Sequence, residues 1–513
     1  MTMQHPSYIE ILPGAGPIKL EAIPVLDYSD FSTLIINKLS SDAVHCVLYY
    51  AFPYHSGWKF IAVLADDATG KFQVFSHEQS RAVTTLESIT PQFPALHLFE
   101  REIHENTGIY FDKHPWLKPV RFSHNRFRKD LAMNDYPFYR IDSEELHEVG
   151  VGPIHAGVIE PGHFRFICNG EKVIHLEIQL GYQHRGIEQL MMEADSGLKR
   201  CVLAESIAGD TTVGHAVAHT ELMESLAGIN ISPRLHAERA ISLELERIAV
   251  HIGDTAALCT DVAYQFGQVV NEALRTTIIN TTQLWCGNRF GKGLIRPGGT
   301  HYPLTTSVID SMISTLANTG SRFREITDNI FTAPSLLIRF DGIGTVTREQ
   351  ALSIGAVGMA AKMAGLKRDI RTTHPTGIYS ELNYESEVLD SGDVLARAML
   401  RNLEARKSID LVTTTASGLL NTDIENLSSD TRLPILSSAL LPSSFSFSVC
   451  EGWRGEIAHA AVTDSNGELT HYKIKDPSFH NWMALALAVR NQEISDFPVC
   501  NKSFNLSYCG HDL

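Results

Sequence analysis

Residues 1–135 alternate between strand-like and helix-like hydrophobic patterns. Three runs combine β-branched and aromatic residues as buried strands do, at residues 45–52 (HCVLYYAF), 58–66 (WKFIAVLAD) and 71–77 (KFQVFSH). Residues 86–108 follow with apolar positions at helical spacing. Strands followed by a helical segment predict a small α+β domain over residues 1–135.

Helical periodicity dominates the rest of the chain. Residues 136–150 have no clear period, and we interpret them as an extended connector. Strand-like segments follow at 163–169 and 171–183. Long helical patterns then cover residues 198–228, 235–267, 307–331, 348–366 and 392–412. Near the end, residues 456–476 alternate around an Asn-Gly pair, which predicts a β-hairpin. We therefore expect a mainly α-helical domain with small β-sheets over residues 151–513.

Composition and charge narrow the class of protein. The chain has 513 residues, of which 44% are hydrophobic and 20% charged, as in ordinary globular proteins. Its formal net charge of -16 argues against nucleic acid as the main partner and against direct adhesion to anionic lipid. No run approaches the roughly 18 apolar residues of a membrane span, and the start lacks the regions of a secretory signal. We expect a cytoplasmic protein that reaches a membrane only through partner subunits.

The eight cysteines show no C-x-x-C pair, so they predict no iron–sulfur or zinc motif. Scattered cysteines in a reducing compartment mostly behave as small, buried apolar residues.

Five segments of the second domain resemble, in the same order, the large subunits of complex I and of membrane-bound nickel–iron hydrogenases. They are GPIHAGVIEPGHFRF with EIQLGYQHRGIEQL, SLELERIAVHIGD, IRPGG, RFDGIGTVTREQALSIGAVGMAAKMAGLKRDIR and EGWRGEIAHAAVTDSNGELTHYKIKDPSFHNW. In the first domain, FEREIHENTGIYFDKHPWLK is similar to the thirty-kilodalton subunit of complex I, the neighbour of that large subunit. The two are fused in this order in formate-hydrogenlyase-type, group 4 hydrogenases. The resemblance implies a fold like that of nickel–iron hydrogenase large subunits and of the corresponding forty-nine-kilodalton subunit of complex I.

The family holds nickel and iron with four thiolates, which are soft ligands suited to these metals. In this chain the positions that match the four cysteines hold Ala208, Thr211, Ser507 and Gly510. None of these side chains supplies a thiolate, so we expect no nickel–iron cluster and no cofactor bound by this chain. A mononuclear site that uses Cys509 with His215 is the alternative.

Two further differences fit a lost metal site. Trp453 precedes Arg454 where the family has a Pro-Arg pair, and we predict that the indole fills part of the emptied cavity. A Trp453 side chain turned to solvent would contradict this. Family precursors carry a C-terminal extension that is removed after metal insertion. Because the chain stops at Leu513, about where that cut would fall, we expect no such processing.

The resemblance implies candidate catalytic and ligand-binding residues. Glu160 matches the proton-relay glutamate, and His215 and Arg454 match groups beside the metals. The candidates for a quinone or relay pocket are His155, Arg185 and Glu188, with His163 and His184 in the same region. Complex I pairs its quinone-binding His with a Tyr after the H-R-G segment, and here no Tyr lies between that segment and His215.

Several charged residues in the matched segments also have a structural interpretation. For Arg185 and Glu188, a buried ion pair that fixes a loop near the small subunit is at least as good an interpretation as catalysis. A structural charge network is the favoured interpretation for Glu246, Arg247, Asp369 and Arg371.

These observations leave three functions open, in this order. In the first, the chain passes electrons from a 4Fe–4S cluster to an unknown acceptor such as a quinone, coupled to ion translocation. The cluster would belong to a small subunit similar to the twenty-kilodalton subunit of complex I, and antiporter-like membrane subunits would move the ion at the inner face of the cell membrane. In the second, the chain is an inactive scaffold that transmits protonation or conformational changes. The third is an active nickel–iron hydrogenase with unusual ligands.

Overall fold

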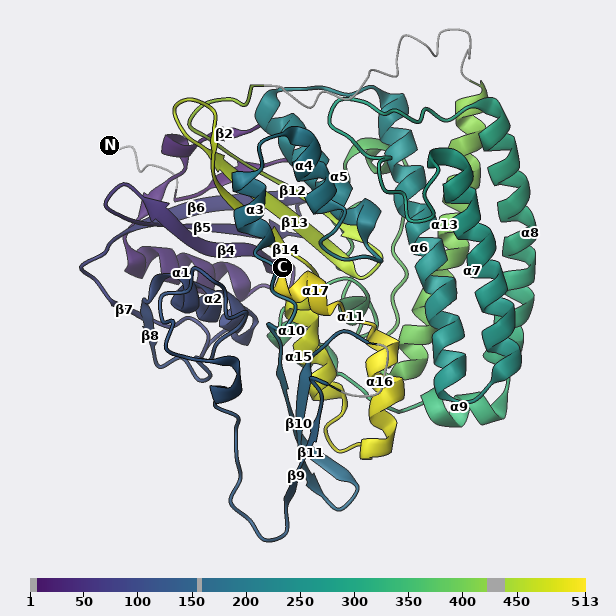
Figure 1. Ribbon diagram of the computed structural model, residues 1–513, viewed down its shortest axis with the longest axis horizontal. Coiled ribbons are helices and arrows are strands. Elements are labelled where there is room, and N and C mark those ends of the chain that lie inside the picture. Colours follow the sequence, from purple (N-terminus) through teal and green to yellow (C-terminus); the bar gives the residue numbers. More distant parts are fainter. Residues whose placement is uncertain (1–6, 155–158, 422–438) are drawn as a thin grey trace.

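The N-terminal part is built on one sheet covered by two helices. The computed structural model describes residues 7–154, 159–421 and 439–513. The sheet runs in the order β1–β6–β5–β4, and β3 pairs with β6 in parallel. Its strands are β1 (Ile9–Ile11), β3 (Val25–Leu26), β4 (Val44–Tyr54), β5 (Gly57–Asp66) and β6 (Lys71–Ser80). The helices α1 (Tyr28–Leu39) and α2 (His97–Thr107) pack on one face, which confirms the predicted α+β arrangement (Figure 1).

The other face of this sheet packs against a sheet from the C-terminal end of the chain. That sheet runs in the order β14–β13–β12–β2. Its strands are β2 (Ile18–Lys19), β12 (Ser444–Gly452), β13 (Gly455–Thr463) and β14 (Leu469–Lys475). Val47 and Ile61 of the first sheet share one buried cluster with Phe445 and Ala460 of the second. Because both faces are covered, the N-terminal strands are continuously apolar rather than alternating. Since β2 pairs with β12, the two predicted domains share a sheet.

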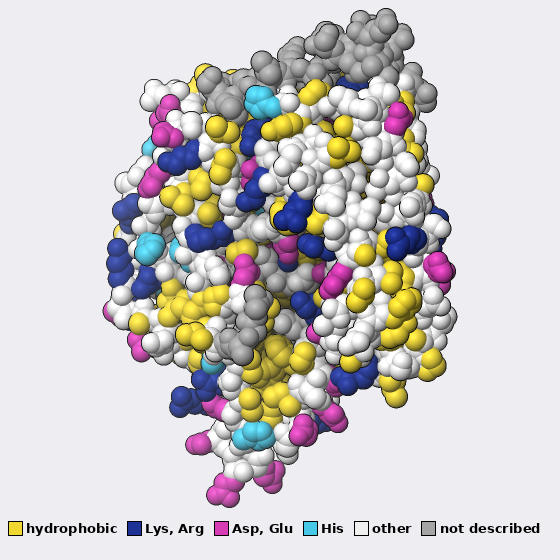
Figure 2. Space-filling view, turned by 45° about the vertical axis from the view of Figure 1, so that its right-hand side comes forward, with side chains coloured by type: hydrophobic (Ala, Val, Ile, Leu, Met, Phe, Trp, Pro, Cys, Tyr) yellow, Lys and Arg dark blue, Asp and Glu magenta, His cyan; other side chains and the backbone are white. Residues whose placement is uncertain are grey.

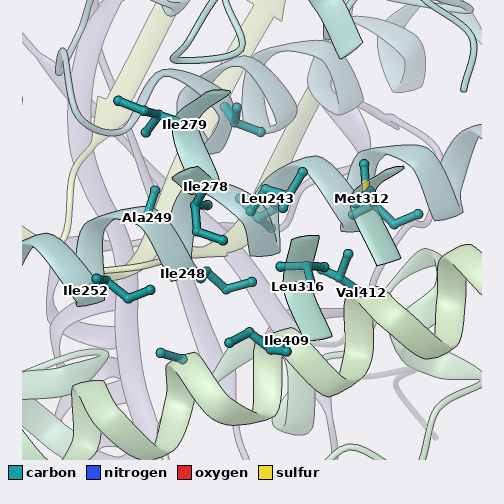
Figure 3. Packing of buried hydrophobic residues seen from close by; sticks show 14 of the residues in the cluster. Leu243, Ile248, Ala249, Ile252, Ile278, Ile279, Met312, Leu316, Ile409 and Val412 are labelled. Carbon is teal, nitrogen blue, oxygen red and sulfur yellow. The ribbon is translucent and has the colours of Figure 1, made fainter. Parts of the chain in front are cut away.

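Four long helices form the main core of the second part (Figure 1). They are α6 (Pro233–Asp261), α7 (Gln265–Cys286), α8 (Thr306–Ile330) and α13 (Val394–Asn421). Their facing sides bury aliphatic side chains such as Ile248, Ile278, Leu316 and Ile409 (Figure 3). The Ser232 hydroxyl accepts a backbone hydrogen bond of 3.3 Å and begins α6. The predicted helical core is therefore present.

Shorter elements surround these two bodies. The strands β9 (His147–Val151), β10 (His163–Asn169) and β11 (Lys172–Gln179) form a projecting sheet at the bottom of Figure 1. The strands β7 (Thr85–Glu87) and β8 (Tyr110–Asp112) pair in parallel. The short α-helices are α3 (Ile187–Glu193), α4 (Gly197–Ala204), α5 (Thr212–Ala227), α9 (Pro334–Phe340), α10 (Arg348–Ser353), α11 (Met359–Lys362), α12 (Ile370–Thr373), α15 (Ser478–Ala488), α16 (Phe497–Phe504) and α17 (Tyr508–Asp512). The 3-10 helices are η1 (Leu20–Ala22), η2 (Pro94–Leu96), η3 (Met133–Asp135), η4 (Gly377–Ser380) and η6 (Ile494–Asp496).

The surface carries a marked depression. Figure 2 shows acidic and basic side chains gathered around it in the middle of one face, with hydrophobic side chains below. Among the described helices, none is both long enough and apolar enough to cross a membrane.

The structure differs from the predicted elements in four places. The pattern over residues 348–366 breaks after α10, because Gly358 has φ of 56° and an added Cβ would lie 2.2 Å from the Gly455 Cα. The segment 198–228 splits into α4 and α5, and the intervening residues carry positions of the candidate site. Helix α7 was not predicted, since its Thr-rich and Asn-rich sequence has low helix propensity. The predicted connector, 136–150, ends inside strand β9.

Gly455→Ala tests the close contact that breaks the predicted helix. We expect a free energy of unfolding lower by about 2–4 kcal/mol, because Gly455 has φ of 137° and an added Cβ would lie 2.7 Å from the Gly358 Cα. Gly418→Ala is the control, since its added Cβ meets no atom within 4 Å on the exposed side of α13. Unfolding in guanidinium chloride, followed by circular dichroism, measures both. A Gly455→Ala midpoint equal to the wild-type midpoint would contradict the prediction.

Candidate functional site

The four positions that match metal-binding cysteines lie at the starts of two helices. Thr211 precedes α5, and its hydroxyl donates to Asp210 Oδ1 at 3.3 Å. Ser507 precedes α17, and its Oγ accepts the backbone N–H of Gly510 at 2.9 Å. Ala208 is fully buried and offers a methyl group. The Ser507 hydroxyl therefore caps the start of α17, whereas the Thr211 hydroxyl bonds the neighbouring carboxylate and caps no helix.

Arg454 links the segment before α5 to the segment before α17. Its Nη1 and Nη2 donate to the two carboxylate oxygens of Asp210 at 2.7 and 2.6 Å, a bidentate pair. Its Nε donates to the Asn505 carbonyl at 2.6 Å, and Nη1 also reaches Thr211 Oγ1 at 3.1 Å. Burial alone would lower the pKa of Arg454, but the charge of Asp210 outweighs it and raises that pKa. The guanidinium is thus a fixed, neutralised cross-link between the two halves of the site.

Trp453 is buried beside this pair. Its side chain is 2% exposed, and its indole N–H donates to the Asp210 carbonyl at 2.8 Å. The Arg454 guanidinium lies 3.9 Å from the centre of the indole ring, and His251 meets that ring edge-on at 6.2 Å. The solvent-exposed orientation that would have contradicted a cavity-filling role for Trp453 does not occur.

A carboxylate lies where a side chain at residue 510 would point. A Cβ added to Gly510 would lie 2.7 Å from both Cγ and Oδ2 of Asp476. Asp476 accepts the Ser478 N–H at 2.8 Å and contacts His215 Nε2 at 3.0 Å. Burial would raise the pKa of Asp476, but His215 and Arg454 hold it below its ordinary value. A cysteine at residue 510 would meet this carboxylate, so the residues present do not fit a nickel–iron centre held by four thiolates.

Behind Asp476 runs a chain of buried hydrogen bonds. His215 Nδ1 lies 3.1 Å from His459 Nε2, and His459 Nδ1 lies 2.8 Å from the Tyr472 hydroxyl. The same hydroxyl lies 2.8 Å from His219 Nδ1. Burial lowers the pKa of His219 to about 3, and burial with the charge of His215 holds the pKa of His459 well below its ordinary value. A chain of imidazoles and a phenol can pass a proton along its length, since each group can both donate and accept.

The sequence analysis missed most of this chain. His215 and His219 are four residues apart and so share one face of α5, which was a usable signal. Their partners His459 and Tyr472 lie on β13 and β14, far away in sequence. Asp210 and Asp476 were missed for the same reason, because only the folded chain brings them beside Arg454 and Gly510.

Glu160 lies on the other side of the C-terminal segment. Its Oε2 accepts the backbone N–H of Cys509 at 3.4 Å. Burial raises the pKa of Cys509 to about 11, so this residue remains a thiol at neutral pH. His155, the first residue of the predicted quinone pocket, lies outside the described residues. The structure therefore brings His215 and Arg454 together around Asp476 and places Glu160 beside Cys509.

Arg185 and Glu188 have different partners, so the ion pair between them, one of the two interpretations of the sequence, is not formed. The Arg185 guanidinium donates to the carbonyls of Ser206, Ile207 and Cys509 at 2.6, 2.7 and 3.1 Å. Glu188 pairs with Lys473 at 3.0 Å and accepts a backbone N–H of β14 at 2.9 Å. Burial would raise the pKa of Glu188, but Lys473 and a nearby arginine lower it. Both side chains tie the H-R-G segment to neighbouring backbone.

The two further histidines near the candidate quinone or relay pocket, His163 and His184, also contact backbone carbonyls. His163 Nδ1 lies 2.8 Å from the Gly152 carbonyl, and His184 Nδ1 lies 2.8 Å from the Asp512 carbonyl.

Of the four residues assigned to a structural charge network, Arg247, Asp369 and Arg371 take part in one, and Glu246 lies outside it. Arg371 pairs with Asp369 at 2.7 Å and with Glu244 at 3.0 Å, and Arg247 pairs with Glu244 at 3.0 Å. Glu246 accepts the backbone N–H groups of Val213 and Gly214 in the first turn of α5, at 2.7 and 3.1 Å. Burial, with a smaller effect of the Asp210 charge, raises the pKa of Glu246 to about 8.

The alternative of a mononuclear metal site gains no support from the geometry. Both ring nitrogens of His215 contact protein groups, and Cys509 Sγ lies 3.4 Å from Ser507 Oγ. Cys500 is buried in α16, and burial raises its pKa to about 11. Within residues 7–154, 159–421 and 439–513, no group of three or more His, Cys, Asp or Glu side chains is arranged to hold a metal ion.

Comparisons with known proteins agree with this architecture. Residues 261–512 match the family of the respiratory-chain NADH dehydrogenase 49 kDa subunit, and residues 49–137 match the family of its 30 kDa subunit. Both matches lie in one polypeptide, so the chain joins two complex I modules. The two matched modules and the relatives fit a fused large subunit related to group 4 hydrogenases.

The relatives include both hydrogenase subunits and an NADH-quinone oxidoreductase subunit. Hydrogenase-4 component G of Escherichia coli is 25% identical over 484 residues, covering 90% of this chain and 80% of the relative. Formate hydrogenlyase subunit 5 of the same organism is 27% identical over 442 residues, covering 82% and 76%. An NADH-quinone oxidoreductase subunit of Dehalococcoides mccartyi is 27% identical over 357 residues, covering 68% and 93%. The chain is thus a complex I-like oxidoreductase subunit.

A double-mutant cycle tests the contact between residue 510 and Asp476. Gly510→Ala is expected to lower the free energy of unfolding by about 2 kcal/mol or more, because its Cβ would meet the carboxylate at 2.7 Å. Asp476→Ala removes that carboxylate, so the double variant should lose at least about 1 kcal/mol less than the sum of the single losses. Chemical unfolding of all four proteins measures the coupling. Strictly additive losses would show that the two positions do not touch.

The pH dependence of stability tests the raised pKa of Glu246. Its pKa of about 8 lies above the ordinary carboxyl value, so the folded state holds a proton that the unfolded chain releases. This contribution is complete below the ordinary carboxyl pKa and is lost as the pH rises toward 8, by up to about 1.4 kcal/mol per pH unit. Glu246→Gln should flatten the decline between pH 6 and 8, measured by chemical unfolding. Glu325→Gln on the exposed side of α8 is the control, and an unchanged slope in Glu246→Gln would refute the assignment.

Proposed function

We propose that this chain is the large subunit of a membrane-associated, complex I-like assembly and that it works without a nickel–iron centre. In this role it transmits protonation or conformational changes between partner subunits. The observation that carries the proposal is the Asp476 carboxylate 2.7 Å from the Cβ position of residue 510, with the Asp210–Arg454 pair beside it. Charged protein groups thus take the place that the thiolate ligands would need.

Proton movement is the chemistry that these residues support. Asp476 begins the hydrogen-bonded chain through His215, His459, Tyr472 and His219, all of which are buried. A change of charge at the Asp210–Arg454 pair, which is open to solvent on the Asp210 side at 44% exposure, acts directly on Asp476. The chain therefore offers a route by which a surface event reaches the core without an electron acceptor.

We infer the partner subunits from the proteins that the chain is similar to. The relatives' names mark them as parts of multisubunit enzymes: a hydrogenase component, a formate hydrogenlyase subunit and a quinone oxidoreductase subunit. On this basis the chain docks with a small subunit that carries a 4Fe–4S cluster and with antiporter-like membrane subunits. It would be peripheral on the inner face of the cell membrane. The charged depression in Figure 2 provides a face of suitable character for such docking.

Electron transfer to a quinone is the second candidate. It is favoured by the match to an NADH-quinone oxidoreductase subunit, of which this chain covers 93%. Against it stand the missing Tyr after the H-R-G segment and the buried Trp453, which fills space beside the site. Scaffold and coupling roles therefore rank above electron transfer, and an active hydrogenase ranks third.

Metal and quinone analysis of the intact, membrane-extracted complex tests the proposal. We expect far less than one nickel atom per large subunit, because the matched positions provide no thiolate. Iron is expected only at the level of the partner's cluster, and organic extraction should yield no stoichiometric quinone. Stoichiometric nickel would overturn the proposal, whereas one quinone per chain would favour the second candidate.

A further inference from the structure

A large cavity lies where the two parts of the chain meet. Its volume is about 560 Å³, within the range of small-molecule sites. Its walls come from the loop 11–18 between β1 and β2, the end of α5, the start of α6, the loop 374–377 and the stretch 445–449 of β12. Leu12 on the wall is 62% exposed, so the cavity reaches the surface. It shares helix α5 with the candidate site, but none of the residues described at that site lines it.

The charge of the cavity has one sign. Two carboxylates line it, Glu221 and Glu224, and none of the described residues on its walls is Lys or Arg. Glu224 is neutralised within the protein, because Arg239 donates to it at 2.8 and 2.6 Å. Glu221 is half-buried and has neither a hydrogen bond nor an ion pair with any described residue. An unpaired carboxylate on the wall of a cavity favours a cationic ligand.

Another part of the cavity wall is aromatic. Phe447 is half-buried, lies 5.1 Å from Phe72 edge-on and stacks with Phe445 at 5.9 Å between ring centres. All three rings line the cavity. Aromatic faces attract cations and also accept the apolar body of a ligand.

We propose that this cavity binds a small organic cation, an ammonium, amidinium or guanidinium group on an apolar body. Glu221 is the counter-ion of the cationic group, and Phe447 contacts the apolar part. A metal ion is a poorer fit, because no group of three or more potential ligands is present among the described residues. This site goes beyond the proposed function and does not rest on it.

The position of Glu221 connects the site with the protein core. A smaller cavity behind the first one shares Glu221, His236 and Thr376 with it and extends to Arg371 and Glu451. A cation bound beside Glu221 would therefore lie close to the buried ion-pair network. Occupancy of the site would change the electrostatic balance of that network.

Benzamidinium and its neutral isostere benzamide are matched probes for this site. Titration calorimetry with the purified full-length chain should show benzamidinium bound at least about tenfold more tightly than benzamide. Glu221→Gln keeps the side-chain shape and should remove that preference. Glu381→Gln, an exposed position beyond the wall, should keep it. No binding of benzamidinium at about 10 mM, or equal binding by Glu221→Gln and wild type, would overturn the proposal.

The pH dependence of binding provides a second measurement. Burial, with the charge of Glu224, raises the pKa of Glu221 to about 7, while Arg239 opposes the shift. The other titratable or charged groups around the two cavities are His236 on α6, Arg371 on α12, His374 after α12, Tyr379 on η4, and Cys450 and Glu451 on β12. Benzamidinium should bind about tenfold more weakly at pH 6 than at pH 8, because most Glu221 side chains are protonated at the lower value. Affinity that is constant over this range in the wild type would contradict the role of Glu221.

Discussion

The ion-pair network centred on Glu244 determines where the candidate site lies. Glu244 accepts from Arg371, Arg247, Tyr379 and Ser408, which come from α12, α6, η4 and α13. Burial would raise the pKa of Glu244, but Arg247 and Arg371 lower it to about 2. Removing one partner of such a pair leaves an uncompensated buried charge, which costs about 3–5 kcal/mol. The network therefore requires these four elements to hold one arrangement.

The same network positions the residues of the site. Arg247 donates to the carbonyls of Glu451 and Gly452 at 2.7 and 3.0 Å, which fixes the end of β12 against α6. Trp453 and Arg454 follow immediately in the chain, so their placement depends on that contact. Arg454 is then buried and needs a counter-charge, which Asp210 supplies from the start of α5. The geometry at the site is a consequence of charge pairing in the core.

Hydrophobic periodicity along the sequence predicted the strands and helices that depend on local sequence alone. The strands β4, β5 and β6, the hairpin β13–β14 with its Asn466-Gly467 turn, and the long helices α6, α8 and α13 were all predicted. The break between α10 and α11 was not predicted, because Gly358, which precedes α11, is in close contact with Gly455, and that residue lies far along the chain. The resemblance pointed to Thr211 and Gly510, whose side chains are evident from sequence alone. It could not identify Asp476 as the neighbour of Gly510, since only the folded chain brings the residue after β14 beside α17.

The hydrogen-bonded chain behind Asp476 gives the proposed coupling role a physical basis. Asp476 is held below its ordinary pKa and the imidazoles of His459 and His219 are held neutral, so the negative charge at one end has no fixed positive charge at the other. A positive charge that enters this chain is attracted by the Asp476 carboxylate, beside which His215 and Arg454 already lie. Its arrival would weaken the attraction that holds Arg454 between Asp210 and Asn505. Protonation at the centre and the position of the surface carboxylate Asp210 are therefore linked through one guanidinium, and a coupling subunit requires a link of this kind.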